Sequence, residues 1–140
     1  MKTDAVVVCE LFHPKAVVPR KAHDTDACYD LYLPDSAVIA PGEVACLDTG
    51  VAIELPEGWE AQIRGRSGLA KKGIWVHNGT VDHLYRNSIM VILCNLSGKE
   101  YAFQAGDRIA QMKISRVAEI DLFKGKVVQT KRGGFGSTGR

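Results

Sequence analysis

The last ten residues of the chain combine glycine, hydroxyl, basic and aromatic side chains. Residues 131–140 contain four glycines, three basic residues, Ser137, Thr138 and Phe135. Glycine lets a backbone approach a ligand closely and turn its N–H groups toward it. The hydroxyl and basic groups suit a polyphosphate, and Phe135 could stack on a base. Because chain ends are often disordered, this composition is equally compatible with a solvated tail.

A second group of polar residues is formed by Arg66, Ser67 and Gly68, just after a predicted strand that ends at Arg64. Residues 67–72 are expected to form a short helix with Ser67 as its N-terminal cap. A helix N-terminus beside an arginine is a favourable anion site. The alternative is an ordinary helix cap surrounded by surface charges.

A predicted β-hairpin at Asn78-Gly79 is followed closely by a carboxylate and an aromatic ring. Asn-Gly is the strongest short hairpin signal, and the edge of a hairpin exposes backbone groups that can read the hydrogen-bonding edge of a base. Asp82 could act as a general base, and Tyr85 could lie against a sugar ring. A hairpin with a purely structural role is the alternative.

Two further polar residues interrupt predicted apolar strands. Asp30 must face solvent or pair with a metal or another charged group, since burying a lone carboxylate is costly. Gln111 needs hydrogen-bond partners inside its strand. Asp107 and Arg108 precede it at a turn, where a local ion pair is the simpler interpretation.

The elements that must position these residues are short β-strands separated by turn residues. The expected strands are residues 5–12, 29–33, 36–40, 43–47, 50–55, 59–64, 73–77, 88–96, 101–104 and 108–117. Turn signals recur about every 8–12 residues, which is typical of an all-β sandwich or barrel. Residues 88–96 are nearly all apolar, so this strand is predicted to be buried on both faces. No repeat, linker or second domain is evident, and one all-β domain is expected.

The composition is that of an ordinary globular protein, with 46% hydrophobic and 24% charged residues. A formal net charge of +2 is too small to indicate a nucleic-acid or membrane surface. We expect a cytoplasmic protein, because neither a signal-peptide pattern nor a membrane-spanning run is evident. Cys9, Cys46 and Cys94 lie in apolar runs and are interpreted as reduced core residues. An exported disulfide protein is the less favoured alternative.

Together, the polar groups suit a nucleoside polyphosphate bound with Mg²⁺. This ion is usually held by phosphates and water with few protein carboxylates. The sequence has no G-x-x-x-x-G-K-[ST] pattern, which excludes a P-loop NTPase.

In their order along the chain, these groups resemble the motifs of the homotrimeric dUTPase family. The five matching segments are residues 27–31 (ACYDL), 65–70 (GRSGLA), 79–85 (GTVDHLY), 106–111 (GDRIAQ) and 133–139 (GGFGSTG). The resemblance implies a jelly-roll-like core over residues 1–120 and a flexible Gly-rich C-terminal arm over 121–140. It also implies hydrolysis of dUTP to dUMP and pyrophosphate by a homotrimer with shared active sites. The protein would act inside a cell and would be encoded by a cellular or a phage gene.

The resemblance further implies roles for individual residues. Asp82 would activate the water that attacks the α-phosphorus. Asp30 and Gln111 would hold Mg²⁺ through its waters. Tyr85 would stack on the deoxyribose and exclude a 2′-hydroxyl, and Phe135 would cover the uracil. The implied substrate-binding residues are Arg66, Ser67, Gly68, Asn78, Gly79, Val81, Tyr85, Met90, Gln111, Arg132, Phe135, Gly136, Ser137 and Thr138.

The final motif is two residues shorter than the usual family pattern. Aligned on Phe135, the family's arginine falls on Thr130, so either Lys131 or Arg132 takes over its contact with the terminal phosphate. Two other functions stay open at this point: a dCTP deaminase of the same fold and a non-catalytic nucleotide-binding regulatory protein. The Gly-Phe-Gly-Ser-Thr-Gly tail argues against the deaminase, and Asp82 argues against an inactive protein.

Overall fold

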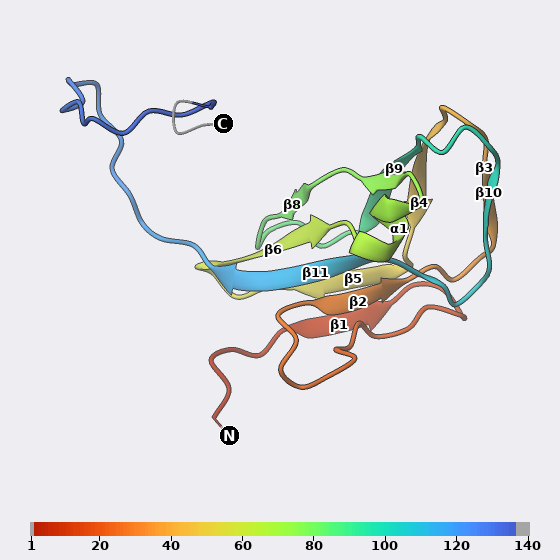
Figure 1. The fold of residues 1–140 in the computed structure, drawn as a ribbon. Helices are drawn as coiled ribbons and strands as arrows, with labels where there is room; N and C mark the ends of the chain where they lie inside the picture. The colour runs from red at the N-terminus through yellow and green to blue at the C-terminus, as the bar shows by residue number, and fades with distance from the viewer. Residues whose placement is uncertain (1, 137–140) are drawn as a thin grey trace.

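The computed structural model describes residues 2–136, which form a jelly-roll-like body of short antiparallel strands and an extended C-terminal arm (Figure 1). Strands predominate because turn residues repeatedly interrupt runs that are rich in β-branched and aromatic side chains. In chain order the elements are β1 (Val8–Leu11), β2 (Tyr29–Tyr32), β3 (Ala37–Ile39), β4 (Val44–Asp48), β5 (Val51–Glu54), β6 (Trp59–Arg64), α1 (Ser67–Lys71), β7 (Ile74–Val76), β8 (Gly79–Val81), β9 (Met90–Asn95), β10 (Tyr101–Phe103) and β11 (Arg108–Arg116).

These strands form four antiparallel sheets around one core. The strand orders are β2-β11-β6-β8, β4-β9-β7, β1-β5 and β10-β3. Strand β11 lies in the middle of the largest sheet, where it pairs with β2 on one side and with β6 on the other. The all-β prediction is therefore confirmed, although most strands are a residue or more shorter than expected.

Strand β6 shows how the sequence pattern directs side chains into the core. Ala61 and Ile63 are buried, whereas Glu60 and Gln62 remain partly exposed. This is the predicted alternation of a strand that has only one face on the core. Neighbouring strands add fully buried side chains such as Leu31 and Ile109.

The prediction that residues 88–96 are buried on both faces is wrong. In β9, Val91 and Leu93 are buried, but Met90 and Ile92 are about 40% exposed. The outward positions are apolar because they belong to an uncovered apolar face of the β4-β9-β7 sheet. Cys46 lies opposite Ile92 on this face and is exposed. The prediction that Cys46 is a core residue is therefore wrong.

The predicted hairpin at Asn78-Gly79 is also wrong. Strand β7 pairs with β9, whereas β8 pairs with β6, so the chain crosses between two sheets at this point. Gly79 lies within β8 opposite Ile63. An Asn-Gly pair favours a tight turn, but here the pairing of each strand with a distant partner determines the local structure.

A buried asparagine links three segments of the β4-β9-β7 end of the body. The Asn95 side chain is fully buried. Its Nδ2 donates to the carbonyls of Ile39 and Lys99, at 3.0 and 2.7 Å. Its Oδ1 accepts bonds from the backbone N–H and the hydroxyl of Ser97. All hydrogen-bonding groups of this amide therefore have partners.

We predict that Asn95→Ala destabilises the protein by about 1–3 kcal/mol, since buried carbonyls would lose their donors. Chemical denaturation followed by fluorescence measures this change. Asn87→Ala, at an exposed position, serves as the control and should change the free energy of unfolding very little. Equal stability of the two variants would contradict the structural role of Asn95.

Candidate functional site

The register of β11 brings two of the predicted site residues together. Gln111 lies opposite Asp30 of β2 on one side and opposite Arg64 of β6 on the other. Its Nε2 donates a 2.8 Å hydrogen bond to the carbonyl of Gly65. The predicted need of Gln111 for partners is thus met at the point where β6 leads into α1.

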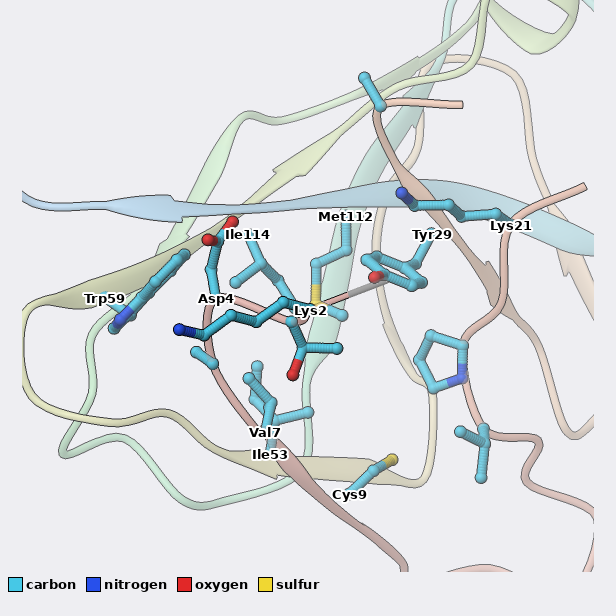
Figure 2. A pocket seen from close by; sticks show the side chains of 15 residues that line it. Lys2, Asp4, Val7, Cys9, Lys21, Tyr29, Ile53, Trp59, Met112 and Ile114 are labelled. Carbon is cyan, nitrogen blue, oxygen red and sulfur yellow. The ribbon is translucent and has the colours of Figure 1, made fainter. Parts of the chain in front are cut away.

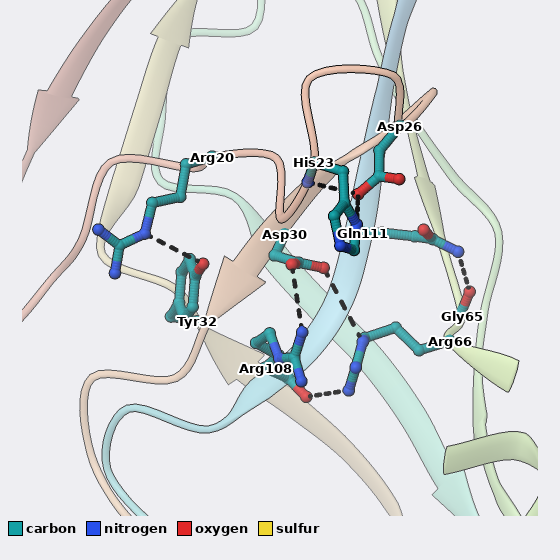
Figure 3. Close-up of polar contacts among 9 residues, drawn as sticks. All are labelled: Arg20, His23, Asp26, Asp30, Tyr32, Gly65, Arg66, Arg108 and Gln111. Carbon is teal, nitrogen blue, oxygen red and sulfur yellow. Dashed lines mark hydrogen bonds and ion pairs between the residues drawn. The ribbon is translucent and has the colours of Figure 1, made fainter. Parts of the chain in front are cut away.

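Asp30 is the centre of an ion-pair cluster (Figure 3). Its carboxylate lies 3.9 Å from Nε of Arg66 and 3.6 Å from Nη1 of Arg108. Arg66 also donates to the carbonyl of Arg108 at 3.2 Å. Only 14% of the Asp30 side chain is exposed, and a carboxylate buried to this degree needs such charged partners. The sequence left solvent exposure, metal binding and ion pairing open for Asp30. The structure shows ion pairs with Arg66 and Arg108.

The partner of Arg108 was not foreseen. The sequence favoured a local pair with Asp107, but the Asp107 carboxylate accepts the N–H of Gln104 at 2.8 Å. Arg108 instead reaches across to β2, because the register between β11 and β2 shifts between Arg108 and Ala110. Sequence spacing carries no signal for a contact that depends on such an irregularity.

Helix α1 begins beside this cluster, but not as predicted. Arg66 occupies the N-cap position, Ser67 is the first helical residue, and no side chain caps the helix. Ser67 and Gly68 are exposed. The Ser67 hydroxyl is therefore not used as a cap, and it follows Arg66, whose guanidinium contacts the Arg108 carbonyl. This arrangement can bind an anion with several negatively charged oxygens.

A separate small cavity brings together four other predicted residues. Its volume is about 160 Å³, and it is lined by Ile63, Gly79, Thr80, Val81, Tyr85, Ile89 and Met90. Of these, Gly79, Val81, Tyr85 and Met90 were predicted. Ile63, Thr80 and Ile89 were missed, because only the pairing of β8 with β6 and the return of the chain into β9 bring them here. Asn78 does not line this cavity.

Asp82 lies next to the small cavity but far from the Asp30 cluster. It follows Val81, which pairs with Ala61, and it is exposed. Asp30 lies three strands away in the same sheet, level with Arg64. With about 4.8 Å between strands and 3.4 Å per residue, the two aspartates are roughly 20 Å apart. One chain therefore does not bring its candidate base and its cationic cluster to the same point.

The candidate residues of the tail lie apart from both groups. The arm runs away from the body after β11 (Figure 1). Arg132 and Gly136 are exposed, and Phe135 is fully exposed with a left-handed φ of 50°. Ser137 and Thr138 lie outside the described residues.

A larger cavity contains none of the predicted site residues (Figure 2). It measures about 520 Å³ and is formed by the N-terminal segment and residues 18–29 together with β5, β6 and β11. Its floor is apolar, with Val7, Ile53, Met112 and Ile114, and Trp59 stands at its side. Cys9 also lines it, and burial raises the pKa of this thiol. The sequence did not predict this groove, because its walls come from segments that lie far apart along the chain.

Within residues 2–136, no three His, Cys, Asp or Glu side chains converge as a metal-binding group. No helix in that range has the length and apolar character needed to cross a membrane.

Comparison with known proteins points to one family. The dUTPase family model matches residues 14–139. The deoxyuridine 5′-triphosphate nucleotidohydrolase of Hydrogenobaculum sp. (strain Y04AAS1) is 50% identical over 131 residues, which cover 89% of this chain and 91% of that protein. The structure of the Staphylococcus bacteriophage 80alpha dUTPase with dUPNHPP has a TM-score of 0.85 at 25% identity, covering 98% and 99% of the two chains. A mutant dUTPase from phage phi11 of S. aureus, described with a structural Mg(II) ion, has a TM-score of 0.80 at 23% identity and covers 88% and 98%.

We predict that Asp30→Asn strengthens the binding of pyrophosphate in the absence of divalent metal. The change removes the negative charge beside Arg66 and Arg108, and one such charge interaction across water is worth roughly 1 kcal/mol, or about fivefold in affinity. Isothermal titration calorimetry measures the effect. Asp107→Asn, whose carboxylate pairs with a backbone N–H, is the control. Unchanged or weaker binding in Asp30→Asn would show that this cluster is not an anion site.

Proposed function

The chain belongs to the dUTPase family, and we propose that it hydrolyses dUTP to dUMP and pyrophosphate. The observation that carries this proposal is the small cavity, because four residues implied in substrate binding line it and Asp82 stands beside it. Its volume of about 160 Å³ is below the ~300–1,000 Å³ of pockets that enclose a whole drug-sized ligand. It suits a single pyrimidine ring.

Gly79 supports this assignment of the base site. It does not adopt a left-handed φ, and an added Cβ would meet the Cβ of Ile63 at 3.6 Å, an ordinary contact. Neither backbone strain nor a clash therefore explains the glycine. The space that a side chain would take from the cavity does explain it, and the bare backbone of β8 can face the edge of a base.

The triphosphate is assigned to the cluster at the start of α1. Arg66 and Arg108 supply positive charge there, and Ser67 and Gly68 are accessible. Lys131 or Arg132 would add a charge when the arm closes over the site, and Phe135 would then cover the base. Gly136, Ser137 and Thr138 would bind phosphate oxygens in that state.

The donor groups fit Mg²⁺ that arrives with the substrate. Asp30 is the single carboxylate of the cluster, and Gln111 adds one amide oxygen, since only its Nε2 is engaged with Gly65. So small a set suits an ion that is held mainly by phosphates and water, with Asp30 and Gln111 holding its waters. When bound, Mg²⁺ would neutralise charge that develops on the phosphate oxygens.

Asp82 is proposed as the general base. Its carboxylate is exposed, so it can accept a proton from a water molecule. The oxygen of that water forms a bond to the α-phosphorus, while the bond from this phosphorus to the oxygen that bridges to the β-phosphorus breaks. Pyrophosphate leaves with the bonding electron pair. Tyr85, on the same segment, would lie against the deoxyribose and leave no room for a 2′-hydroxyl.

A homotrimer with shared sites would bring the separated groups together. The separation of Asp82 from Asp30 by roughly 20 Å supports it, because two groups so far apart in one sheet cannot act on the same phosphate. Sites assembled from neighbouring subunits of a cyclic oligomer remove this difficulty.

The outward face of the β4-β9-β7 sheet supports association as well. Val44, Cys94 and Trp75 lie opposite one another across this sheet, and Ile92 lies in the next row beside Cys46. Val44, Trp75 and Ile92 are 69%, 56% and 41% exposed. A contiguous exposed apolar face of this kind marks a protein–protein interface.

The arm adds a second apolar surface, which is uncovered among the described residues. Leu122, Phe123 and Val128 are at least 88% exposed.

We also propose that the chain divides into a body of residues 1–120 and an arm of residues 121–140, and that the protein is cytoplasmic. The last strand ends at Arg116, which agrees with an arm that begins shortly afterwards.

We predict that Asp82→Asn lowers kcat for dUTP by about 10²- to 10⁴-fold while nucleotide binding is retained, because only the proton acceptor is lost. The measurements are pyrophosphate release and the mass of the products from dUTP, dCTP and dTTP. Asp24→Asn, an exposed change outside the site, is the control. Parent-like turnover by Asp82→Asn would remove Asp82 from the mechanism, and ammonia released from dCTP by the unmodified protein would favour the deaminase.

We also predict a solution mass of three times the 15.3 kDa chain, measured by light scattering. Ile92→Asp should dissociate the assembly and abolish most turnover, because it places a charge on the apolar face of the β4-β9-β7 sheet. Val38→Asp on β3, an exposed apolar position in another sheet, is the matched control and should remain trimeric. A fully active monomer would contradict shared sites.

A further inference from the structure

The segment that joins β8 to β9, residues 82–89, carries both Asp82 and Tyr85 and forms neither helix nor strand. Residues 84–87 are exposed, so packing cannot fix their positions. Inside the segment, the Tyr85 N–H donates to the Asp82 carbonyl at 3.0 Å, and the Tyr85 hydroxyl donates to the Ser88 carbonyl at 2.8 Å. These bonds shape the segment but do not attach its first half to the body.

The attachment of that half is made by Arg86. Its Nη1 donates to Oε1 of Glu54 at 2.7 Å, and its Nε lies 3.4 Å from the carbonyl of His83. Glu54 is the last residue of β5, which pairs with β1 in the body. One guanidinium therefore links the body to the carbonyl of His83, the residue after Asp82.

The second half of the segment is anchored independently. The Ser88 hydroxyl donates to the Asp48 carboxylate, and the Ile89 N–H donates to the Val51 carbonyl at 2.7 Å. Loss of the Arg86–Glu54 contact would therefore leave the end near β9 in place. It would free the turn that follows Asp82, so that Asp82 is held only from its N-terminal side, where Val81 pairs with Ala61.

We propose that Arg86 and Glu54 are positioning residues that hold Asp82 in line with its reaction partner. This inference rests on the proposed function, in which Asp82 is the general base. Arg86 would restrain the segment by its contact with the His83 carbonyl, and Glu54 would hold Arg86 in place. The planar guanidinium can make both contacts at once, which a lysine ammonium cannot do with the same geometry.

Stability is a poor explanation for the pair. The side chains of Arg86 and Glu54 are 49% and 51% exposed, and ion pairs in water contribute little to the free energy of folding. The reaction rate depends more strongly on such a contact than the free energy of folding does, because a displacement of about 1 Å in a reacting group can cost 10²-fold in rate. The contact should therefore affect turnover far more than unfolding.

The test compares Glu54→Ala, Arg86→Ala and the double variant in the full-length protein. Each single change should lower kcat for dUTP by about 10-fold while KM stays within about twofold of the parent value. The double variant should be no slower than either single variant, because both remove the same contact. Glu54→Gln keeps an oxygen that can accept from Arg86, so it should retain most of the parent kcat.

Asp35→Asn is the matched control, since it weakens a surface hydrogen bond of similar length, 2.9 Å, between the side chains of Asp35 and His13. It should leave kcat unchanged, and the melting temperature should be unchanged in all variants. Amide hydrogen exchange gives a readout that does not depend on turnover: residues 82–86 should exchange faster in Glu54→Ala and Arg86→Ala only.

Parent-like kcat and exchange in Glu54→Ala and Arg86→Ala would overturn the proposal. A loss of kcat that is accompanied by a lower melting temperature, or that Glu54→Gln shares in full, would do so too. A parent protein that does not hydrolyse dUTP would refute the proposed function alone, because the exchange measurement still decides whether this contact holds the segment.

Discussion

The register of β11 between β2 and β6 is the constraint on which the polar cluster depends. It sets Gln111 level with both Asp30 and Arg64, so that a largely buried carboxylate, an amide and the turn into α1 meet at one place. A slip of one residue would turn Gln111 toward the opposite face of the sheet. The buried neighbours Ala110 and Met112 resist such a slip, since they would be exposed by it. Apolar packing thus fixes a polar geometry.

The same body keeps its other chemical groups apart. The small cavity and Asp82 lie at β8, the cationic cluster lies across the sheet, and the Gly-rich tail lies on an arm that leaves the body. In the proposed trimer, groups from neighbouring subunits would complete each site, and the uncovered apolar surfaces of the β4-β9-β7 sheet and the arm would form the contacts between subunits. Assembly would then serve catalysis directly, because a dispersed chain would lack a complete site.

Much of this could be predicted from the sequence, and the failures have a common cause. Turn residues and apolar runs located the strands, and the five motifs indicated the family before any contact was known. The pairing of strands and of side chains was not predictable. Asn78-Gly79 lies between strands of different sheets, and Arg108 pairs with Asp30 through an irregular register. Cys46 faces outward from its sheet. Each of these depends on which strands meet, which local sequence does not encode.

Subunit complementation tests the shared site most directly. Asp82→Asn and Arg66→Ala, each with little activity alone, are unfolded together in equal amounts and refolded so that mixed trimers assemble. If Asp82 of one subunit acts on phosphates held by Arg66 of another, random assembly should restore about a quarter of the parent sites. If both residues act within one chain, no intact site can form, and a mixture no more active than its separate components would contradict the account.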